Sequence, residues 1–468
     1  MNRRALTALG LFVGFYLISA LLIAGLLALP VFQMRYGEPG LSSFLALVSA
    51  GYVAWAMLPR REKWIEPGTE LTKEAQPRLW SLLERVAIDA GHPTPKHVYL
   101  LTDVQAFAGS RPRWFGLRRE PTVGLGLPVF AFLSEREIRA VIAHEMGHHA
   151  GGDVKLGAWQ YRTSRAIESA LHRLEDSSLY LNLPYYAYGQ VYLRLTRPAA
   201  REQELHADAL AARLAGGRFL GSALVAVEQH SLLWPAYFHG VVVPTLNEGF
   251  LPPLIEGYER YIAATDLEAH RSDFRTSVAT PPDSDDTHPP LRDRLRTLAT
   301  PCEPMEIRLN VDTPLLSKRS EYERRLLATG FNDPAQIDNL KPLSWDEWGE
   351  TILPRVWFRA LEPRIDGLRP VSLAAIPEAL QNDALWERLR VGINVYSDEA
   401  RANQRRILVT YWCAHLLHEA GYRVVSGPGA EVTMARNESS IQPFRFLRDI
   451  VAGARTPNDW AVFCAGLS

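Results

Sequence analysis

The sequence has few cysteines and almost no net charge. Its three cysteines, Cys302, Cys413 and Cys464, lie far apart and form no CxxC pair. We therefore expect no disulfide framework, and a reducing compartment fits this usage best. The formal net charge is −1 at pH 7, so the composition lacks the strong basic excess that is typical of nucleic-acid-binding proteins. We expect no nucleic acid among the partners.

Charge is also missing from two stretches near the N-terminus. No charged residue occurs from Ala5 to Leu29, and a second uncharged run follows from Leu41 to Leu58. At about 1.5 Å per residue the first run reaches roughly 37 Å, which is enough to cross a hydrocarbon core of about 30 Å. A cleaved signal peptide would have a shorter apolar region and no second one after it. Residues 1–63 are therefore predicted to form a transmembrane hairpin with spans at about 5–29 and 41–58. The alternative is a buried helical hairpin of a soluble domain.

Basic residues flank this pair of spans on one side. Arg3 and Arg4 precede the first span, and Arg60, Arg61 and Lys63 follow the second. The turn between the spans has a single arginine, which a glutamate offsets. Because positive flanks stay on the cytoplasmic side, both ends of the hairpin should face the cytoplasm. We expect a multi-pass protein of the cell (inner) membrane whose catalytic and C-terminal domains are cytoplasmic, with the lipid bilayer as one partner.

The middle of the chain, residues 64–300, reads as a mainly helical domain with a small β-sheet. A strand is predicted at 97–103, and a helix begins at Ser134, where Glu137 three residues later completes a capping box. Residues 177–193 are uncharged but contain proline, glycine and several tyrosines. This composition favours a packed lid or an interfacial segment over a membrane span.

The last third of the chain is predicted to be a separate α/β domain. Residues 301–344 are expected to be a linker, and strands and helices are expected to alternate through residues 345–468. The expected order is a strand at 389–396, a helix at 398–420, strands at "YRVVSG" and "EVTMA", a helix at 441–454, and then "WAVFCAG". The helix at 398–420 contains Cys413, His415, His418 and Glu419, but its spacing does not place all four on one face. We predict core or surface roles for them.

One short helix-like stretch, "AVIAHEMGHHAGGD", contains several residues that can bind a metal ion. His144 and His148 are four residues apart, so both imidazoles lie on one helix face and can bind the same ion. Glu145, between them, can take a proton from zinc-bound water, whose pKa the metal lowers toward 7. A surface helix can carry this HExxH pattern by chance, so the metal-site interpretation requires a third ligand.

The best third ligand lies in a second predicted helix, "RPAAREQELHADALAARLAG". Glu204 and Asp208 share one face of it, and Glu204 would complete a His₂Glu zinc site with an open fourth position. Asp208 could then accept the other N–H of a ligand imidazole and fix its orientation. The alternative is a solvated helix face beside Arg201 and Arg213.

Together these two stretches resemble the integral-membrane gluzincins, the group that holds the HtpX-type bacterial proteases and the type I CAAX prenyl proteases. HEMGHHAGGD and REQELHADA match the family pattern of HExxH, an Asp five residues beyond the second His, and R-x-x-E-x-x-x-D. The resemblance implies a gluzincin-type catalytic domain with one Zn²⁺ per chain. The residues it assigns are His144, His148 and Glu204 as ligands, Glu145 as the catalytic base, and Asp208, Asp153 and Arg201 as their supporting partners.

Two further elements carry the resemblance. "THPPLRDRL" supplies His288 and Arg294, which by family likeness stabilise the oxyanion of the tetrahedral intermediate, a task that suits a cation and a His donor. The family segment N-A-F-A reads Gln105-Ala106-Phe107-Ala108 here, so the Asn is replaced. Residues 122–130 occupy the family position of an edge strand that holds substrate in extended form, with an edge strand that binds no substrate as the alternative. The substrate-binding residues implied are Gln105, Ala106, Phe107, Gly124, Leu125 and Gly126.

The sequence therefore predicts a membrane-anchored zinc endopeptidase that cleaves extended segments of protein or peptide substrates. Membrane-associated substrates and membrane-protein quality control are the role it suggests. Two departures from the family stand out, because no two further membrane spans are evident after HExxH and the tail from about residue 345 has no counterpart. Two alternatives stay open. One is an inactive protease-fold scaffold or regulator that works through its C-terminal domain. The other is a prenyl-peptide processing protease, which would need an enclosed chamber with many spans.

Overall fold

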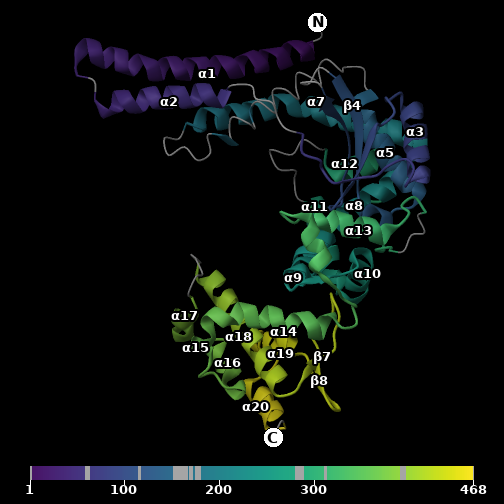
Figure 1. Ribbon diagram of the computed structural model, residues 1–468, viewed down its shortest axis with the longest axis vertical. Coiled ribbons are helices and arrows are strands. Elements are labelled where there is room, and N and C mark those ends of the chain that lie inside the picture. Colours follow the sequence, from purple (N-terminus) through teal and green to yellow (C-terminus); the bar gives the residue numbers. More distant parts are fainter. Residues whose placement is uncertain are drawn as a thin grey trace.

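The computed structural model describes residues 3–38, 40–57, 64–113, 118–150, 167, 172–173, 181–279, 289–309, 314–390 and 397–466. Its first two helices, α1 (Arg3–Tyr36) and α2 (Leu41–Met57), pack side by side and extend away from the remainder of the chain (Figure 1). Within α1, Leu9–Tyr36 is long and apolar enough to cross a membrane, whereas α2 is a shorter apolar helix of 17 residues. Both predicted helices are thus present, and one of them meets the length of a span.

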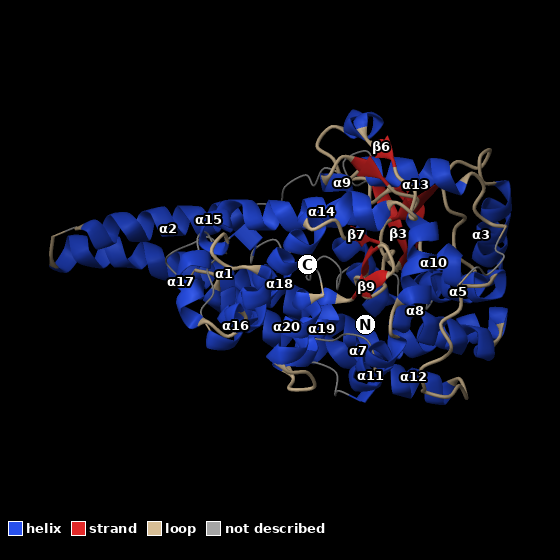
Figure 2. Cartoon of the chain, turned by 90° about the horizontal axis from the view of Figure 1, so that it is seen from below, coloured by secondary structure: helices blue, strands red, loops and turns tan. Residues whose placement is uncertain are grey.

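The main sheet contains β1 (Thr69–Glu70), β2 (His97–Leu101), β3 (Ala106–Arg113) and β4 (Arg118–Gly126) in the order β1-β2-β4-β3. In Figure 2, where β3 is labelled, red strands lie among the blue helices. Strand β4 pairs with β2 in parallel and with β3 in antiparallel orientation. The prediction that residues 122–130 begin with an edge strand is therefore wrong, because both hydrogen-bonding edges of β4 are occupied. The last strand on this side of the sheet is β3, which carries Ala106 and Phe107.

Helices surround this sheet and form one continuous core with it. Trp80, Leu100, Leu125, Ile142 and Trp234 are among its buried members. The elements that build this body are α3 (Pro77–Ala90), α4 (Val129–Phe132), α5 (Glu135–Ala150), α7 (Leu183–Ala215), α8 (Gly217–Tyr237), the π-helical turn η2 (Phe238–Val242), α9 (Val243–Asn247), β5 (Phe250–Leu251), α10 (Leu254–Ala264), α11 (Leu267–Ala279) and α12 (Leu291–Thr297).

Residues 314–343 differ from the linker expected there. They form α13 (Arg319–Ala328), η3 (Pro334–Asn339) and β6 (Lys341–Pro342), and β6 pairs with β5. Leu326 and Leu343 are buried in the same core as the sheet, together with Trp345. The sheet-containing body therefore extends past residue 300, because these side chains complete its hydrophobic core.

One helix joins this body to the C-terminal region. Helix α14 (Trp348–Leu361) buries Trp348 and Ile352 in the first core, and Trp357 and Leu361 in a second core. Short turns follow: η4 (Glu362–Arg364), α15 (Ile365–Leu368), η5 (Leu373–Ala375), α16 (Ile376–Ala379) and α17 (Asp383–Leu389).

The C-terminal region is mainly helical around the long helix α18 (Asp398–Glu419), which matches the helix predicted at 398–420. Its strands β7 (Arg423–Val424), β8 (Met434–Arg436) and β9 (Ser439–Ile441) form a small antiparallel sheet, followed by α19 (Pro443–Val451) and α20 (Pro457–Ala465). "WAVFCAG" lies in α20 and not in a strand, because a capping box between Thr456 and Asp459 begins a helix that buries Trp460. Most of the strand predicted at 389–396 lies outside the described residues.

Candidate metal centre

The helix that carries the HExxH motif is anchored at its N-terminus, as the capping box predicts. The backbone N–H of Ser134 donates to Glu137 Oε2 at 2.8 Å, and the Glu137 N–H donates to Ser134 Oγ at 3.4 Å. The other carboxylate oxygen of Glu137 accepts from Ser222 of α8 at 2.6 Å and from Arg308 at 3.0 Å. Burial would raise the pKa of Glu137, but these hydrogen bonds and Arg308 hold it below its usual range. The start of α5 is therefore fixed to two other parts of the body.

The second helix of the site, α7, is one continuous helix of 33 residues. Its C-terminal half packs against α5 and its N-terminal half against α1. The contact with α5 is close at Gly147, where a Cβ atom would lie 3.0 Å from Ala207 Cα and 3.2 Å from Ala207 Cβ. Residue 147 therefore has to be small for the two helices to approach this closely. The approach brings Glu204 and Asp208 opposite the histidines.

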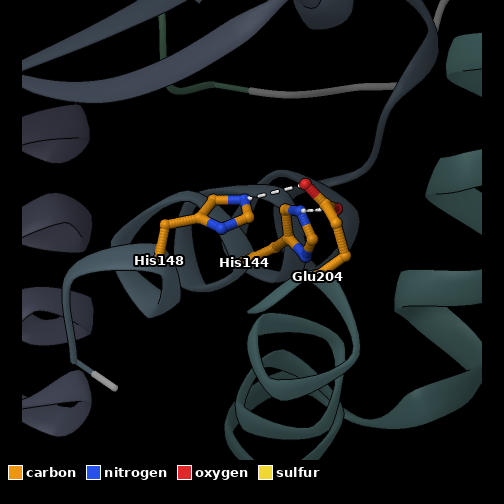
Figure 3. A group of neighbouring side chains, drawn as sticks. All are labelled: His144, His148 and Glu204. Carbon is orange, nitrogen blue, oxygen red and sulfur yellow. Dashed lines mark ion pairs between the residues drawn. The ribbon is translucent and has the colours of Figure 1, made fainter. Parts of the chain in front are cut away.

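Three side chains from these two helices converge (Figure 3). His144 Nε2 lies 3.5 Å from Glu204 Oε2, and His148 Nε2 lies 3.6 Å from Glu204 Oε1. One donor atom from each residue lies within 4.8 Å of the other two. His144 and Glu204 are buried, while the His148 side chain is 28% exposed. Helix α5 thus supplies the two imidazoles and α7 the carboxylate, as the two motifs predict.

A second layer of contacts orients His144. Its Nδ1 lies 2.9 Å from Asp208 Oδ1, so its Nε2 faces Glu204. Asp208 in turn accepts two hydrogen bonds from Arg294 of α12, from Nε at 2.9 Å and from Nη2 at 2.7 Å. Arg294 Nη2 also lies 3.4 Å from His144 Nε2, and Nη1 lies 3.8 Å from Glu204 Oε2. In this arrangement Arg294 binds Asp208 in bidentate fashion and holds in place the carboxylate that orients His144.

The electrostatics of the site favour positive charge at its centre. Burial lowers the pKa of His144, but its contacts with Asp208 and Glu204 outweigh burial and raise it to about 9. Burial likewise raises the pKa of Asp208, but Arg294 and His144 lower it by more, so this carboxylate stays ionised at neutral pH. Two buried carboxylates facing one imidazole thus stabilise a cation there.

This donor set fits a zinc ion. Two imidazole nitrogens and one carboxylate oxygen are the His₂Glu set of a catalytic zinc site, and a carboxylate behind one imidazole is its usual support. The set combines donors of the types that zinc binds with a local surplus of negative charge. Among the residues that the structure describes, it is the group that could hold a metal ion.

The remaining predicted site residues fall into three groups. Glu145 is half-buried on α5 beside the ligands, and Arg201 is half-buried on α7 one turn before Glu204. Asp153 and His288 lie outside the described residues. Gln105 is exposed at the start of β3, and Ala106 and Phe107 follow it on that strand.

Gly124, Leu125 and Gly126 are buried inside the sheet, so their assignment to substrate binding is not supported. Gly124 is the register partner of Phe107, whose ring occupies the position of a Cβ at residue 124. At Gly126 a Cβ would collide with the backbone oxygen of Asp103. These two glycines make room for their neighbours.

Sequence reasoning missed two contributors to the site. Gly147, one of the unspecified positions of HExxH, permits the close approach of α7. Its only signal was a glycine inside a predicted helix, which usually has a packing reason. Arg308, which supports Glu137, lies in the stretch expected to be a linker and had no local signal.

Comparisons with known proteins bear on the family resemblance of this site. Residues 73–301 match the model of peptidase family M48. This stretch includes both site helices and Arg294, and the resemblance to the HtpX-like membrane metallopeptidases is thereby confirmed. Residues from 302 onward lie outside the match.

The similar curated proteins carry one name. The chain is 24% identical to a Protease HtpX homolog of Methanocaldococcus jannaschii, over 53% of this chain and 95% of that protein. It is 29% identical to one from Tropheryma whipplei over 24% of this chain and 38% of that protein, and 31% identical to one from Dictyoglomus thermophilum over 30% and 45%. The alignment with the Tropheryma protein thus spans about two fifths of that relative. No solved structure matches the chain.

Proposed function

We propose that this protein is a membrane-anchored, zinc-dependent endopeptidase with its catalytic body in the cytoplasm. The observation that carries the proposal is the convergence of His144, His148 and Glu204 from two helices, with donor atoms within 4.8 Å of one another. Asp208 and Arg294 support this group from behind, as a catalytic metal site requires. The family match is consistent with peptidase chemistry at this site.

In the proposed mechanism the chain holds zinc through His144, His148 and Glu204. When bound, zinc polarises the scissile carbonyl and lowers the pKa of a water molecule toward 7. The Glu145 carboxylate accepts a proton from the attacking water and passes it to the nitrogen of the leaving amine. Asp208 Oδ1 lies 2.9 Å from His144 Nδ1, where it would accept the Nδ1–H and keep Nε2 directed at the metal position.

The oxyanion would be stabilised by His288, as the family likeness implies. Arg294 contributes differently from that expectation, because its Nε and Nη2 atoms both donate to Asp208. We infer that Arg294 is mainly a positioning residue, whose remaining Nη1 lies on the Glu204 side of the site.

The substrate is proposed to bind as an extended strand along β3. This strand ends the sheet on its side, and it packs against the HExxH helix α5. Main-chain hydrogen bonds along such an edge accept many sequences, which suits a protease of broad specificity. Exposed Gln105 lies at the beginning of this edge. Membrane-protein quality control is the role this arrangement would serve, because the hairpin α1–α2 keeps the site beside the membrane.

The experiment is a pair of substitutions in the full-length protein, purified in detergent. Glu145→Gln should keep zinc, measured by mass spectrometry, and lower the rate of casein cleavage by about 10²–10⁴-fold, because the proton acceptor is lost. Glu204→Gln should lose both zinc and activity, because a ligand is lost. Glu135→Gln, an exposed acid in the first turn of the same helix, is the control and should change neither.

Two results would contradict the proposal. One is cleavage at the unsubstituted rate by the Glu145→Gln protein. The other is a purified, folded, unsubstituted protein that contains no zinc and binds none on titration.

A further inference from the structure

Strand β3 has one face on which a side chain is missing between two large ones. Phe107, Gly109 and Arg111 alternate along the strand with residues that point the other way, so these three share one face of the sheet. The ring of Phe107 covers Gly124 on β4, and Arg111 reaches across the sheet, where its Nη1 donates to the Tyr99 hydroxyl at 3.2 Å. Gly109 places no side chain between these two, so it leaves a gap on this face.

A buried hydroxyl group lies beside this gap. Gly109 is the register partner of Thr122 on β4, and a Cβ at Gly109 would lie 3.6 Å from both Thr122 Oγ1 and Phe107 Cδ2. Thr122 is fully buried, and within the described part of the chain its hydroxyl has no hydrogen-bond partner. Buried hydroxyl groups normally have such a partner. Gly109 itself is half-buried, so the gap reaches the surface at the outer strand.

A strand that pairs with β3 would place one of its side chains over Gly109. Directly opposite residues on paired strands have their side chains on the same face, with Cβ atoms about 4.5–5.5 Å apart. From the bound strand, Thr122 lies two strands away, at a main-chain distance of about 9–10 Å. An aromatic ring is the side chain that best covers a glycine on an edge strand. Tyrosine adds a hydroxyl at the far end of such a ring, where it can reach Thr122.

We propose that the gap at Gly109 is a specificity site for a tyrosine side chain of the substrate, with Thr122 as the residue that selects the tyrosine hydroxyl. The tyrosine ring lies over Gly109 beside Phe107, and its hydroxyl forms a hydrogen bond with Thr122 Oγ1. This assignment rests on the proposed binding of substrate along β3, and it adds the kind of side chain that the edge strand selects.

Other side chains fit this gap less well. Phenylalanine fills the same space but leaves the Thr122 hydroxyl without a partner. Lysine and arginine are long enough, but their charge would enter beside the guanidinium of Arg111. The two nearby carboxylates already have partners, since Glu66 Oε1 lies 3.6 Å from Arg111 Nη2 and Glu120 Oε2 lies 3.1 Å from His97 Nε2. A neutral ring with a terminal hydroxyl is thus the best match.

The test compares peptides of one host sequence that carry tyrosine, phenylalanine or alanine at each position in turn around a single cleavage site. The full-length, zinc-loaded protein in detergent cleaves them, and kcat/KM is measured for each peptide. We expect one position at which tyrosine is preferred to phenylalanine by about 3–10-fold, the effect of one hydrogen bond between neutral groups. At the same position phenylalanine should be preferred to alanine.

Four variants test which residues produce the preference. Thr122→Val should bring the ratio of tyrosine to phenylalanine to about 1, whereas Thr122→Ser keeps a hydroxyl and should retain the preference. Gly109→Ala adds a Cβ that makes only ordinary contacts at 3.6 Å, so it should fold, fill the gap and weaken the preference for both aromatic residues over alanine. Ser110→Ala, on the opposite face of β3, is the control and should retain the preference. Zinc content and thermal unfolding show which variants are folded, and Gly109→Ala decides the question if Thr122→Val is not.

The outcomes separate this inference from the proposed function. If the peptides are cleaved but tyrosine and phenylalanine are equal at every position, the inference is overturned and the proposed function stands. A preference for tyrosine that persists in the folded Thr122→Val protein also overturns it, because the selecting group then lies elsewhere. If the zinc-loaded protein cleaves neither the peptides nor casein, the proposed function fails and the inference fails with it.

Discussion

Histidines and acidic residues lie within a few turns of one another at two places in this chain, with opposite results. At the metal centre His144, His148 and Glu204 come from two helices and converge. On α18 similar residue types diverge. Cys413 is buried in the C-terminal core, the His415 ring lies 5.4 Å from that of Trp412, and His418 Nε2 lies 3.0 Å from Glu350 Oε1. Residue content alone therefore does not distinguish a metal site from ordinary packing.

The difference lies in what faces each imidazole. Burial lowers the pKa of both His144 and His415. At His144 the carboxylates of Asp208 and Glu204, both on α7, reverse this effect and raise the pKa to about 9. At His415 the pKa stays below its usual value, although Glu419 opposes the shift. Helix α7 presents two carboxylates to His144, whereas His418 faces the Glu350 carboxylate of α14 with Arg423 Nη1 3.0 Å from its Nε2, and this difference in local charge separates the cation site from the α18 cluster.

The largest expected effect is the pH dependence of zinc binding, which tests whether the pKa of His144 is raised while that of His415 is lowered. The pKa of His144 is raised from 6.5 to about 9. In chelator-treated, metal-free protein, protonation of His144 therefore stabilises the folded state fully below about pH 6.5, and this stabilisation is lost as the pH rises through about 9. Zinc must displace that proton. The apparent zinc affinity should therefore rise about tenfold per pH unit until about pH 9. Competition with a zinc chelator across this range measures it, and an affinity that levels off near pH 6.5 would contradict the account.

The orienting role of Asp208 gives the next largest effect. Asp208→Asn should weaken zinc affinity by about 10–100-fold, because the carboxylate charge is lost and the amide can turn its NH₂ group toward Nδ1, so the tautomer and ring orientation of His144 are no longer fixed. Glu350→Gln is the matched control on the other cluster, since it removes the carboxylate that faces His418. It should leave zinc affinity unchanged. Both are measured by chelator competition, with thermal unfolding to confirm that the variants are folded. Equal affinities in the two variants would show that Asp208 does not support the metal.

The same comparison explains what the sequence could and could not predict about the site. His144 and His148 lie four residues apart on one helix, so local periodicity is enough to pair them. Glu204 is distant in sequence, and only the combination of two motifs made it the third ligand. Arg294 was placed correctly near the site, but its bidentate contact with Asp208 depends on how α12 packs, which no local pattern records.

The errors in the fold have a common cause as well. Whether a strand is at an edge depends on the strands that pair with it. The parallel pairing of β2 with β4 decides this for residues 122–126. The apolar run "WAVFCAG" is too short for its periodicity to separate strand from helix, and the capping box at Thr456 decides in favour of a helix. Residues 314–343 looked like a linker because their few apolar side chains, such as Leu326 and Leu343, become informative only once the first core is known.

The smallest expected effect tests whether the close packing of α5 on α7, which brings two carboxylates to His144, matters for the metal centre. Gly147→Ala places a Cβ 3.0 Å from the backbone of Ala207, so one helix must shift. We expect a loss of about 1–3 kcal/mol of stability, typical of an overpacked contact. Gly240→Ala is the control, because nothing lies within 4 Å of its added Cβ, and it should be neutral or stabilising by up to about 1 kcal/mol. Thermal unfolding of the two zinc-loaded proteins in detergent measures the difference. A Gly147→Ala protein as stable as the Gly240→Ala protein would mean that α5 and α7 do not approach this closely, and the convergence of His144 and Glu204 would then lack its packing basis.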